Sequence, residues 1–172
     1  REGFYEKHGV KVLVGERAIT INRQEKVIHS SAGRTVYYDK LIMATGSYPW
    51  IPPIKGSDTP DCFVYRTIED LNAIEACARR SKRGAVVGGG LLGLEAAGAL
   101  KNLGVETHVI EFAPMLMAEQ LDTMGGEQLK RKIESMGVRV HTSKNTKEIL
   151  QQGTEARKTM QFADGSELQV DF

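Results

Sequence analysis

Residues 86–97 read Val-Val-Gly-Gly-Gly-Leu-Leu-Gly-Leu-Glu-Ala-Ala, and this stretch indicates the class of fold. It contains the pattern GxGxxG as Gly88, Gly90 and Gly93. Ala85–Gly88 has the short apolar run of a buried strand, and Leu91–Leu103 is predicted to be a helix that ends at the next glycine. The three glycines therefore lie in a turn that leads from a strand directly into a helix.

Each glycine of this turn has a physical reason. Gly88 allows the chain to turn tightly, Gly90 lets a pyrophosphate approach the backbone, and Gly93 lets the helix pack closely on the strand. The backbone amides of Leu91, Leu92 and Gly93 lie at the positive end of the helix dipole, where they can bind two phosphates without a lysine. The turn predicts a dinucleotide-binding site.

Glu111 supplies the second part of the pattern. It lies 23 residues after Gly88, at the end of the predicted strand Glu106–Glu111, where a carboxylate can accept hydrogen bonds from the adenosine ribose. Residues 112–129 contain no Lys, Arg or His, so a 2′-phosphate would meet no cation. We therefore predict that NADH binds at least about tenfold, or ~1.4 kcal/mol, more tightly than NADPH.

Glu95 in the same helix has two interpretations. It can be a carboxylate that the helix dipole favours near the N-terminus. It can also project, with Leu92, toward the nicotinamide end of the cofactor, and we predict this second role.

Strand and helix patterns alternate through the second part of the chain. Thr67 and Asp70 form a capping-box-like start of a first helix, Asp122 is placed to cap a third one, and Val138–His141 is the third strand. This βαβαβ order predicts a parallel sheet with right-handed crossovers, the Rossmann-like α/β fold of FAD- and NAD(P)-binding domains. Lys158–Phe162 and Glu167–Phe172 are predicted to be a hairpin with an Asp-Gly turn, part of a β-meander.

The first part of the chain is predicted to be a β-meander. Its expected strands are Val10–Val14, Ala18–Asn22, Lys26–His29, Thr35–Tyr38 and Leu41–Thr45. The spacing of Gly33, Val36, Tyr38 and Asp39 matches that of Gly165, Leu168, Val170 and Asp171, which suggests an internal duplication.

Four of the five prolines lie in residues 48–60 and predict a linker. We therefore expect residues 1–47 to be the C-terminal piece of an earlier domain and residues 48–61 to be a Pro-rich linker. Residues 62–172 are then a nucleotide-binding domain that is truncated at its C-terminus.

Composition excludes several classes of function. The 172 residues hold 23 Lys and Arg against 22 Asp and Glu, so no basic field predicts a nucleic-acid partner. The longest uncharged run, Leu41–Ile54, has 14 residues and three prolines, too few for a membrane span. Cys62 and Cys77 have neither metal-ligand nor redox spacing. With no export signal visible, we expect a soluble, cytoplasmic protein without a metal site in this chain.

Two motifs carry a family resemblance. The pattern GxGxxGxEAA at Gly88–Ala97 and Tyr-Asp-Lys-Leu-Ile-Met-Ala-Thr-Gly-Ser at 38–47 resemble the flavoprotein reductases with two dinucleotide-binding domains. The resemblance implies that the domain ending at residue 47 binds FAD. It places near FAD the residues Ala18, Ala44, Thr45 and Gly46. The glycine-rich turn of such an FAD domain is absent from this sequence.

Within that family, the chain is similar to the nitrite reductase branch over its whole length, including residues 1–9, 46–56 and 111–122. That similarity implies a path from NADH to FAD, then through an iron–sulfur cluster to sirohaem, where nitrite becomes ammonium. The cluster and sirohaem would be held by parts of the protein downstream of this chain. The partners that the resemblance implies are NADH, the FAD domain of the same chain and a small subunit of the reductase.

Other functions stay open from the residues alone. A rubredoxin- or ferredoxin-reductase-like flavoprotein would lack downstream cysteine clusters. A non-catalytic NADH-sensing module would bind NADH with no flavin. A methyltransferase that holds S-adenosylmethionine is disfavoured by the third glycine and by the Ala-Thr-Gly segment.

Overall fold

The computed structural model describes residues 3–151 and 157–172 and divides into two compact units, Arg1–Ser47 and Tyr48–Phe172. The first unit has a short helix and one antiparallel sheet in the order β1-β2-β3. Its elements are α1 (Phe4–Lys7), β1 (Ala18–Asn22), β2 (Val27–Ser30) and β3 (Thr35–Tyr37). Three of the five strands expected here are therefore confirmed.

The expected strands Val10–Val14 and Leu41–Thr45 are wrong. Both segments are irregular, and the sheet of this unit has no further strand to pair with them among the described residues. Most of their apolar side chains are exposed, with Val14 82% and Ile42 88% accessible. A strand needs a hydrogen-bonded neighbour, so an apolar run without one stays irregular.

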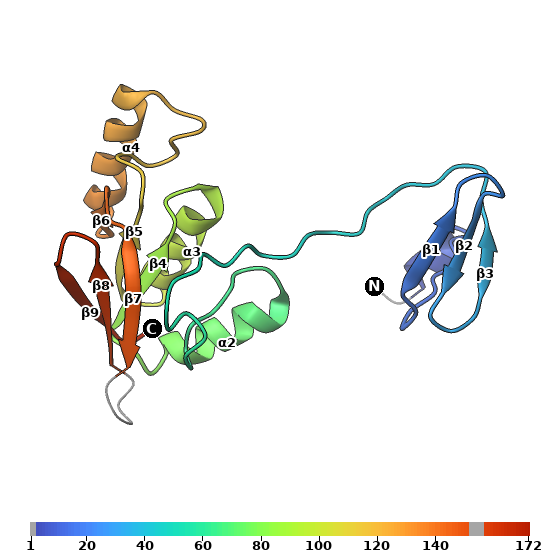
Figure 1. The fold of residues 1–172 in the computed structure, drawn as a ribbon, viewed down its shortest axis with the longest axis horizontal. Helices are drawn as coiled ribbons and strands as arrows, with labels where there is room; N and C mark the ends of the chain where they lie inside the picture. Colours follow the sequence, from blue (N-terminus) through green and yellow to red (C-terminus); the bar gives the residue numbers. More distant parts are fainter. Residues whose placement is uncertain (1–2, 152–156) are drawn as a thin grey trace. The chain divides into compact units, whose positions relative to one another are not determined.

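The second unit is built on a parallel sheet, as the alternating pattern predicts. The strands β4 (Arg83–Val87), β5 (Glu106–Ile110) and β6 (Arg139–His141) lie in the order β4-β5-β6. The register pairs Val86 with Val109, and Val109 with Val140. Three helices accompany these strands: α2 (Ile68–Ala78), α3 (Leu91–Asn102) and α4 (Thr123–Ser135). Figure 1 shows the resulting α/β arrangement in the part coloured from green to orange.

A second, antiparallel sheet packs beside the parallel one (Figure 1). It has the order β7-β8-β9, formed by β7 (Thr146–Gln151), β8 (Lys158–Phe162) and β9 (Glu167–Val170). The hairpin of β8 and β9 is confirmed, whereas β7 is absent from the sequence-based prediction. Lys147 and Glu148 interrupt the apolar pattern of β7, which is defined by its pairing with β8.

Alternation along β5 builds the two apolar layers of this unit. Val109 faces the helices, in a core with Ala97, Leu116 and Val140. Ile110 faces the antiparallel sheet, in a core with the three buried residues Met160, Phe162 and Val170. The parallel sheet is thus covered on one face by helices and on the other by β7–β9.

The Pro-rich segment has no helix and no strand, although part of it is anchored. Lys55 forms a β-bridge with Glu148 and accepts a hydrogen bond from the Ile149 amide at 2.8 Å. A Cβ on Gly56 would lie 2.1 Å from the Ile149 oxygen, so only glycine fits this approach. Trp50 is 81% exposed. Within the described ranges, no helix is long and apolar enough to cross a membrane.

Candidate dinucleotide-binding site

The glycine-rich turn lies where β4 ends and α3 begins. The Gly88 amide donates to the Ile110 oxygen at 2.8 Å, which ties the turn to the end of the neighbouring strand β5. Gly88 has a φ of +117°, in the region that favours glycine. A Cβ on Gly93 would lie 2.0 Å from the Gly88 oxygen. The close packing predicted at Gly93 is therefore present.

Gly90 differs from Gly93 because its surroundings are open. A Cβ at Gly90 would meet no atom within 4 Å. Gly90 is the N-cap of α3, with extended backbone and no side chain that caps the helix. By contrast, Thr67 caps α2 and Asp122 caps α4. The first amides of α3 thus face open space from which an anion can approach.

The side chain of Glu111 lies against this turn and is hydrogen-bonded to it. Its Oε2 accepts from the Gly89 amide at 2.5 Å, and its Oε1 accepts from the Ala113 amide at 2.6 Å. The backbone of Glu111 is fixed too, because its amide donates to the His141 oxygen and its oxygen accepts from the Lys144 amide. A carboxylate has about four acceptor positions, so each oxygen can accept a further hydrogen bond from a ribose hydroxyl.

Gly89 is a residue of this site that the sequence analysis did not single out. It is buried, and a Cβ there would lie 2.6 Å from Leu116 Cδ2 and 3.0 Å from Glu111 Oε2. The Met117 amide donates to its oxygen at 3.1 Å. The signal was available in the sequence, since the middle one of three consecutive glycines occupies the variable position between Gly88 and Gly90 in GxGxxG.

Exposed apolar side chains surround the turn. Leu91 and Leu92 in the first turn of α3 are 70% and 60% exposed, and Phe112 beside Glu111 is 72% exposed. Leu92 and Gly93 also line a mostly apolar cleft of about 790 Å³ that continues along α3 and the edge of β4. Glu95 is exposed and is not among the residues that line this cleft. The structure therefore brings Leu92, but not Glu95, to the cleft.

The four residues predicted to lie near FAD belong to the unit Arg1–Ser47. Ala18 begins β1 and is exposed. Ala44, Thr45 and Gly46 are exposed and irregular, so the strand expected there is not formed.

Comparison with known proteins identifies the family. The pyridine nucleotide-disulphide oxidoreductase family matches residues 3–172. The NADH nitrite reductase large subunit of Escherichia coli (strain K12) is 92% identical over 172 residues, which are all of this chain and 20% of that protein. The nitrite reductase [NAD(P)H] large subunit of Klebsiella oxytoca is 50% identical over 98% of this chain and 18% of its own length.

A solved structure agrees with this result. The ferredoxin reductase from Rhodopseudomonas palustris has a TM-score of 0.88 and 25% identity over all of this chain and 42% of its own. The chain spans about a fifth of the length of the two curated relatives. The chain belongs to the pyridine nucleotide-disulphide oxidoreductase family.

Proposed function

We propose that this chain contains the NADH-binding domain of a flavoprotein reductase that passes a hydride from NADH to FAD. The observation that carries the proposal is the contact of the Glu111 carboxylate with the Gly89 amide at 2.5 Å. This contact supports the proposal, because a carboxylate that can accept hydrogen bonds from a ribose then lies beside a turn whose amides can bind a pyrophosphate. Family membership supports the same assignment.

The residues present fit NADH. Gly90 leaves its side open, and the amides of Leu91 and Leu92 begin a helix that no side chain caps. In this proposal these amides bind the pyrophosphate and Glu111 binds the adenosine ribose. Leu92 packs at the nicotinamide end, and Glu95 is assigned to that end as well. When bound, NADH supplies a hydride to the flavin, and the task of this chain is to place the cofactor.

The charge around Glu111 favours NADH over NADPH. A 2′-phosphate would lie beside a carboxylate, and residues 112–129 supply no cation. Lys144, which follows β6 and donates its amide to Glu111, has its ammonium 2.6 Å from Asp164 and 2.7 Å from Ser166 Oγ. That cation is already paired, so it does not change the expected preference.

The FAD contacts and the electron acceptor rest on family and relatives. We assign Ala18, Ala44, Thr45 and Gly46 to an FAD domain, of which residues 1–47 are the C-terminal part. Because a nitrite reductase large subunit is 92% identical, we propose that the whole protein is a cytoplasmic enzyme that reduces nitrite to ammonium in nitrate assimilation. An iron–sulfur cluster and sirohaem would then be held outside this chain, and a small subunit is a candidate partner.

The test is a calorimetric titration of the chain with NADH and, separately, with NADPH. We expect at least about tenfold tighter binding of NADH. Glu111→Ala should remove the difference, whereas Glu119→Ala, an exposed carboxylate in the following loop, should keep it. Equal binding of both cofactors by the unaltered chain would contradict the assignment of Glu111.

A further inference from the structure

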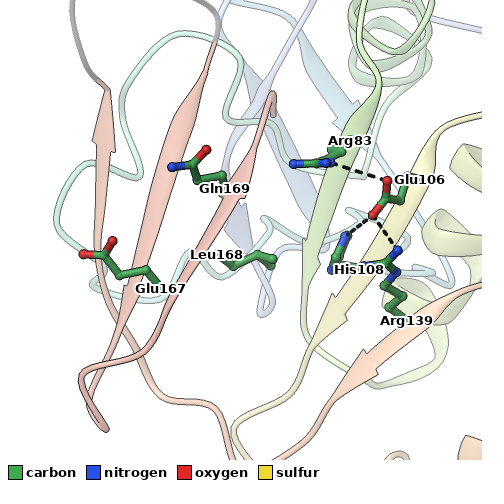
Figure 2. Close-up of a pocket in the computed structure, with 7 residues that line it drawn as sticks. All are labelled: Arg83, Glu106, His108, Arg139, Glu167, Leu168 and Gln169. Carbon is green, nitrogen blue, oxygen red and sulfur yellow. Dashed lines mark hydrogen bonds and ion pairs between the residues drawn. The ribbon is translucent and has the colours of Figure 1, made fainter.

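A charged cluster lies at the edge of the parallel sheet opposite the glycine-rich turn, at the start of β4 and β5. Glu106 is within 3.4 Å of Arg83, 3.1 Å of Arg139 and 3.3 Å of His108. Figure 2 shows these side chains on one side of a cavity of about 230 Å³, and β9 with Glu167, Leu168 and Gln169 on the other. A buried histidine, His108, is among the residues that line this cavity.

That histidine forms a stacked pair with a second one. The rings of His108 and His141 have centroids 5.2 Å apart and an interplanar angle of 9°. His108 Nδ1 lies 3.0 Å from His141 Nε2, and the His108 side chain is only 3% exposed. We do not interpret this histidine pair as a metal site, because the described residues hold no group of three or more His, Cys, Asp or Glu side chains that could bind a metal ion.

The contacts define where the protons are. The Glu106 carboxylate only accepts, so His108 Nε2 carries a hydrogen and donates to it. His108 Nδ1 is then an acceptor, and His141 Nε2 donates to it. A further proton must go to His141 Nδ1 if this hydrogen bond is to survive.

The surroundings oppose that further proton. Burial lowers the pKa of His141, and the neighbouring cations lower it further, as does His108. Burial also lowers the pKa of His108, against the effect of Glu106. The charged groups that face the pair from the packed elements are Arg83 on β4, Glu106 on β5, Arg139 on β6, Lys144 after β6, Lys130 on α4 and Glu167 on β9. Lys144, Arg139 and Lys130 lower the pKa of His141 although each of them also pairs with a carboxylate, namely Asp164, Glu106 and Glu134. A charged His141 is therefore disfavoured in its present position.

His141 is directly connected to the dinucleotide site. It ends β6, it is paired in register with Ile110, and its backbone oxygen accepts from the Glu111 amide at 2.8 Å. The backbone of His141 therefore forms part of the strand end that fixes Glu111.

We propose that the His108–His141 pair is a positioning device for Glu111, so that NADH binds tightly only while both rings are neutral. In the neutral pair, the hydrogen bond between the rings helps to hold the end of β6 against β5, where the His141 backbone oxygen accepts from the Glu111 amide. Protonation of the pair loosens the end of β6 and lets the Glu111 carboxylate leave Gly89. This inference rests on the proposed function, since it assigns regulation to the same site.

The test combines two readouts on the full chain between pH 8.0 and 5.0. By calorimetry, we expect the Kd for NADH to rise at least about fivefold across this range, and to stay level in His141→Gln, which lacks the ring that takes up the further proton. By NMR, the Gly89 and Ala113 amides should shift together with the histidine signals in the unaltered chain. His29→Gln, which removes an exposed histidine of the first unit, should retain the full pH dependence.

The two readouts separate the two hypotheses. If NADH fails to bind at every pH, the proposed function fails, and the Gly89 and Ala113 shifts still decide the inference. If these amides stay level while the histidines titrate, or if the histidines do not titrate above pH 5.0, the inference is overturned. A Kd with the same pH dependence in His141→Gln as in the unaltered chain overturns it too.

Discussion

At the scale of single residues, the glycines of the turn are not equivalent. Gly93 touches the Gly88 oxygen so closely that no side chain fits, whereas Gly98, five residues later in α3, has open space around it. The GxGxxG pattern predicts this requirement correctly, because the contact joins Gly93 to Gly88, which are only five residues apart in the sequence. The contact of Glu111 with Gly89 joins residues 22 apart, and its existence depends on how β4 and β5 pair.

Gly93→Ala should therefore destabilise the second unit by roughly 1–3 kcal/mol, because the added methyl group forces α3 away from β4. Gly98→Ala is the matched control in the same helix and should be neutral or stabilising by up to about 1 kcal/mol. Urea unfolding followed by circular dichroism measures both. Equal effects of the two substitutions would show that the Gly93 contact is not restrictive.

Lys158, in contrast to Gly93, is a residue whose replacement should stabilise the fold. Its side chain is buried, and among the described residues its Nζ has no hydrogen-bond partner. Lys158→Met keeps the aliphatic stem and removes a buried charge, so we expect a gain of about 1–3 kcal/mol in the free energy of unfolding. Lys147→Met, at an exposed position of β7, should change it by less than about 0.5 kcal/mol. A loss of stability in Lys158→Met would mean that the ammonium is in fact paired.

At the scale of elements, local signals predicted the helices better than the strands. The capping box of Thr67 and Asp70 and the Asp122 cap are both present, since a cap depends on residues three apart. The strands predicted at 10–14 and 41–45 are wrong, and the strand β7 was missed, because a strand depends on a partner that can lie far away in sequence. For the same reason the sequence did not indicate Lys144, which follows β6 and donates its backbone amide to the Glu111 oxygen.

The cap of α2 offers a direct test at this scale. Thr67 Oγ1 accepts from the Asp70 amide at 3.2 Å, and the Asp70 carboxylate accepts from the Thr67 amide at 2.8 Å. Thr67→Ala should cost about 0.5–2 kcal/mol, and Thr67→Ser should restore most of the loss. Thermal unfolding by circular dichroism reads out both variants. A serine variant as unstable as the alanine variant would assign the effect to the lost methyl group instead.

At the scale of the whole chain, stability should depend on pH through the histidine pair. Burial lowers the pKa of His108 and His141 below the ordinary 6.5 in the folded chain, so the unfolded chain takes up protons first as the pH falls. The free energy of unfolding is then highest above about pH 6.5 and decreases below it, by at most about 1.4 kcal/mol per pH unit for each histidine. Urea titrations at pH 7.5, 6.5 and 5.5 measure this slope. A flat profile would show that the two rings titrate normally.

The division into two units also predicts a cleavage pattern. Tyr48 and Trp50 are exposed and irregular, and Pro49 protects the bond after Tyr48 from chymotrypsin. Limited chymotrypsin digestion should therefore cut after Trp50 and release a fragment of residues 51–172 that stays folded and, on the proposed function, still binds NADH. Mass spectrometry identifies the product. First cuts inside β4 or α3 would contradict the autonomy of this unit.

Trp50 has a further consequence, for how this protein can be observed. It is the single tryptophan of the chain, and it is already in contact with solvent while the chain is folded. Its fluorescence should peak near the wavelength of free indole in water, and denaturant should hardly move it. The same residue borders the cleft beside Leu92, so a blue shift of its emission would report that something has covered that cleft. The emission of Trp50 should therefore report a ligand or partner bound in the cleft, but not the unfolding of the chain.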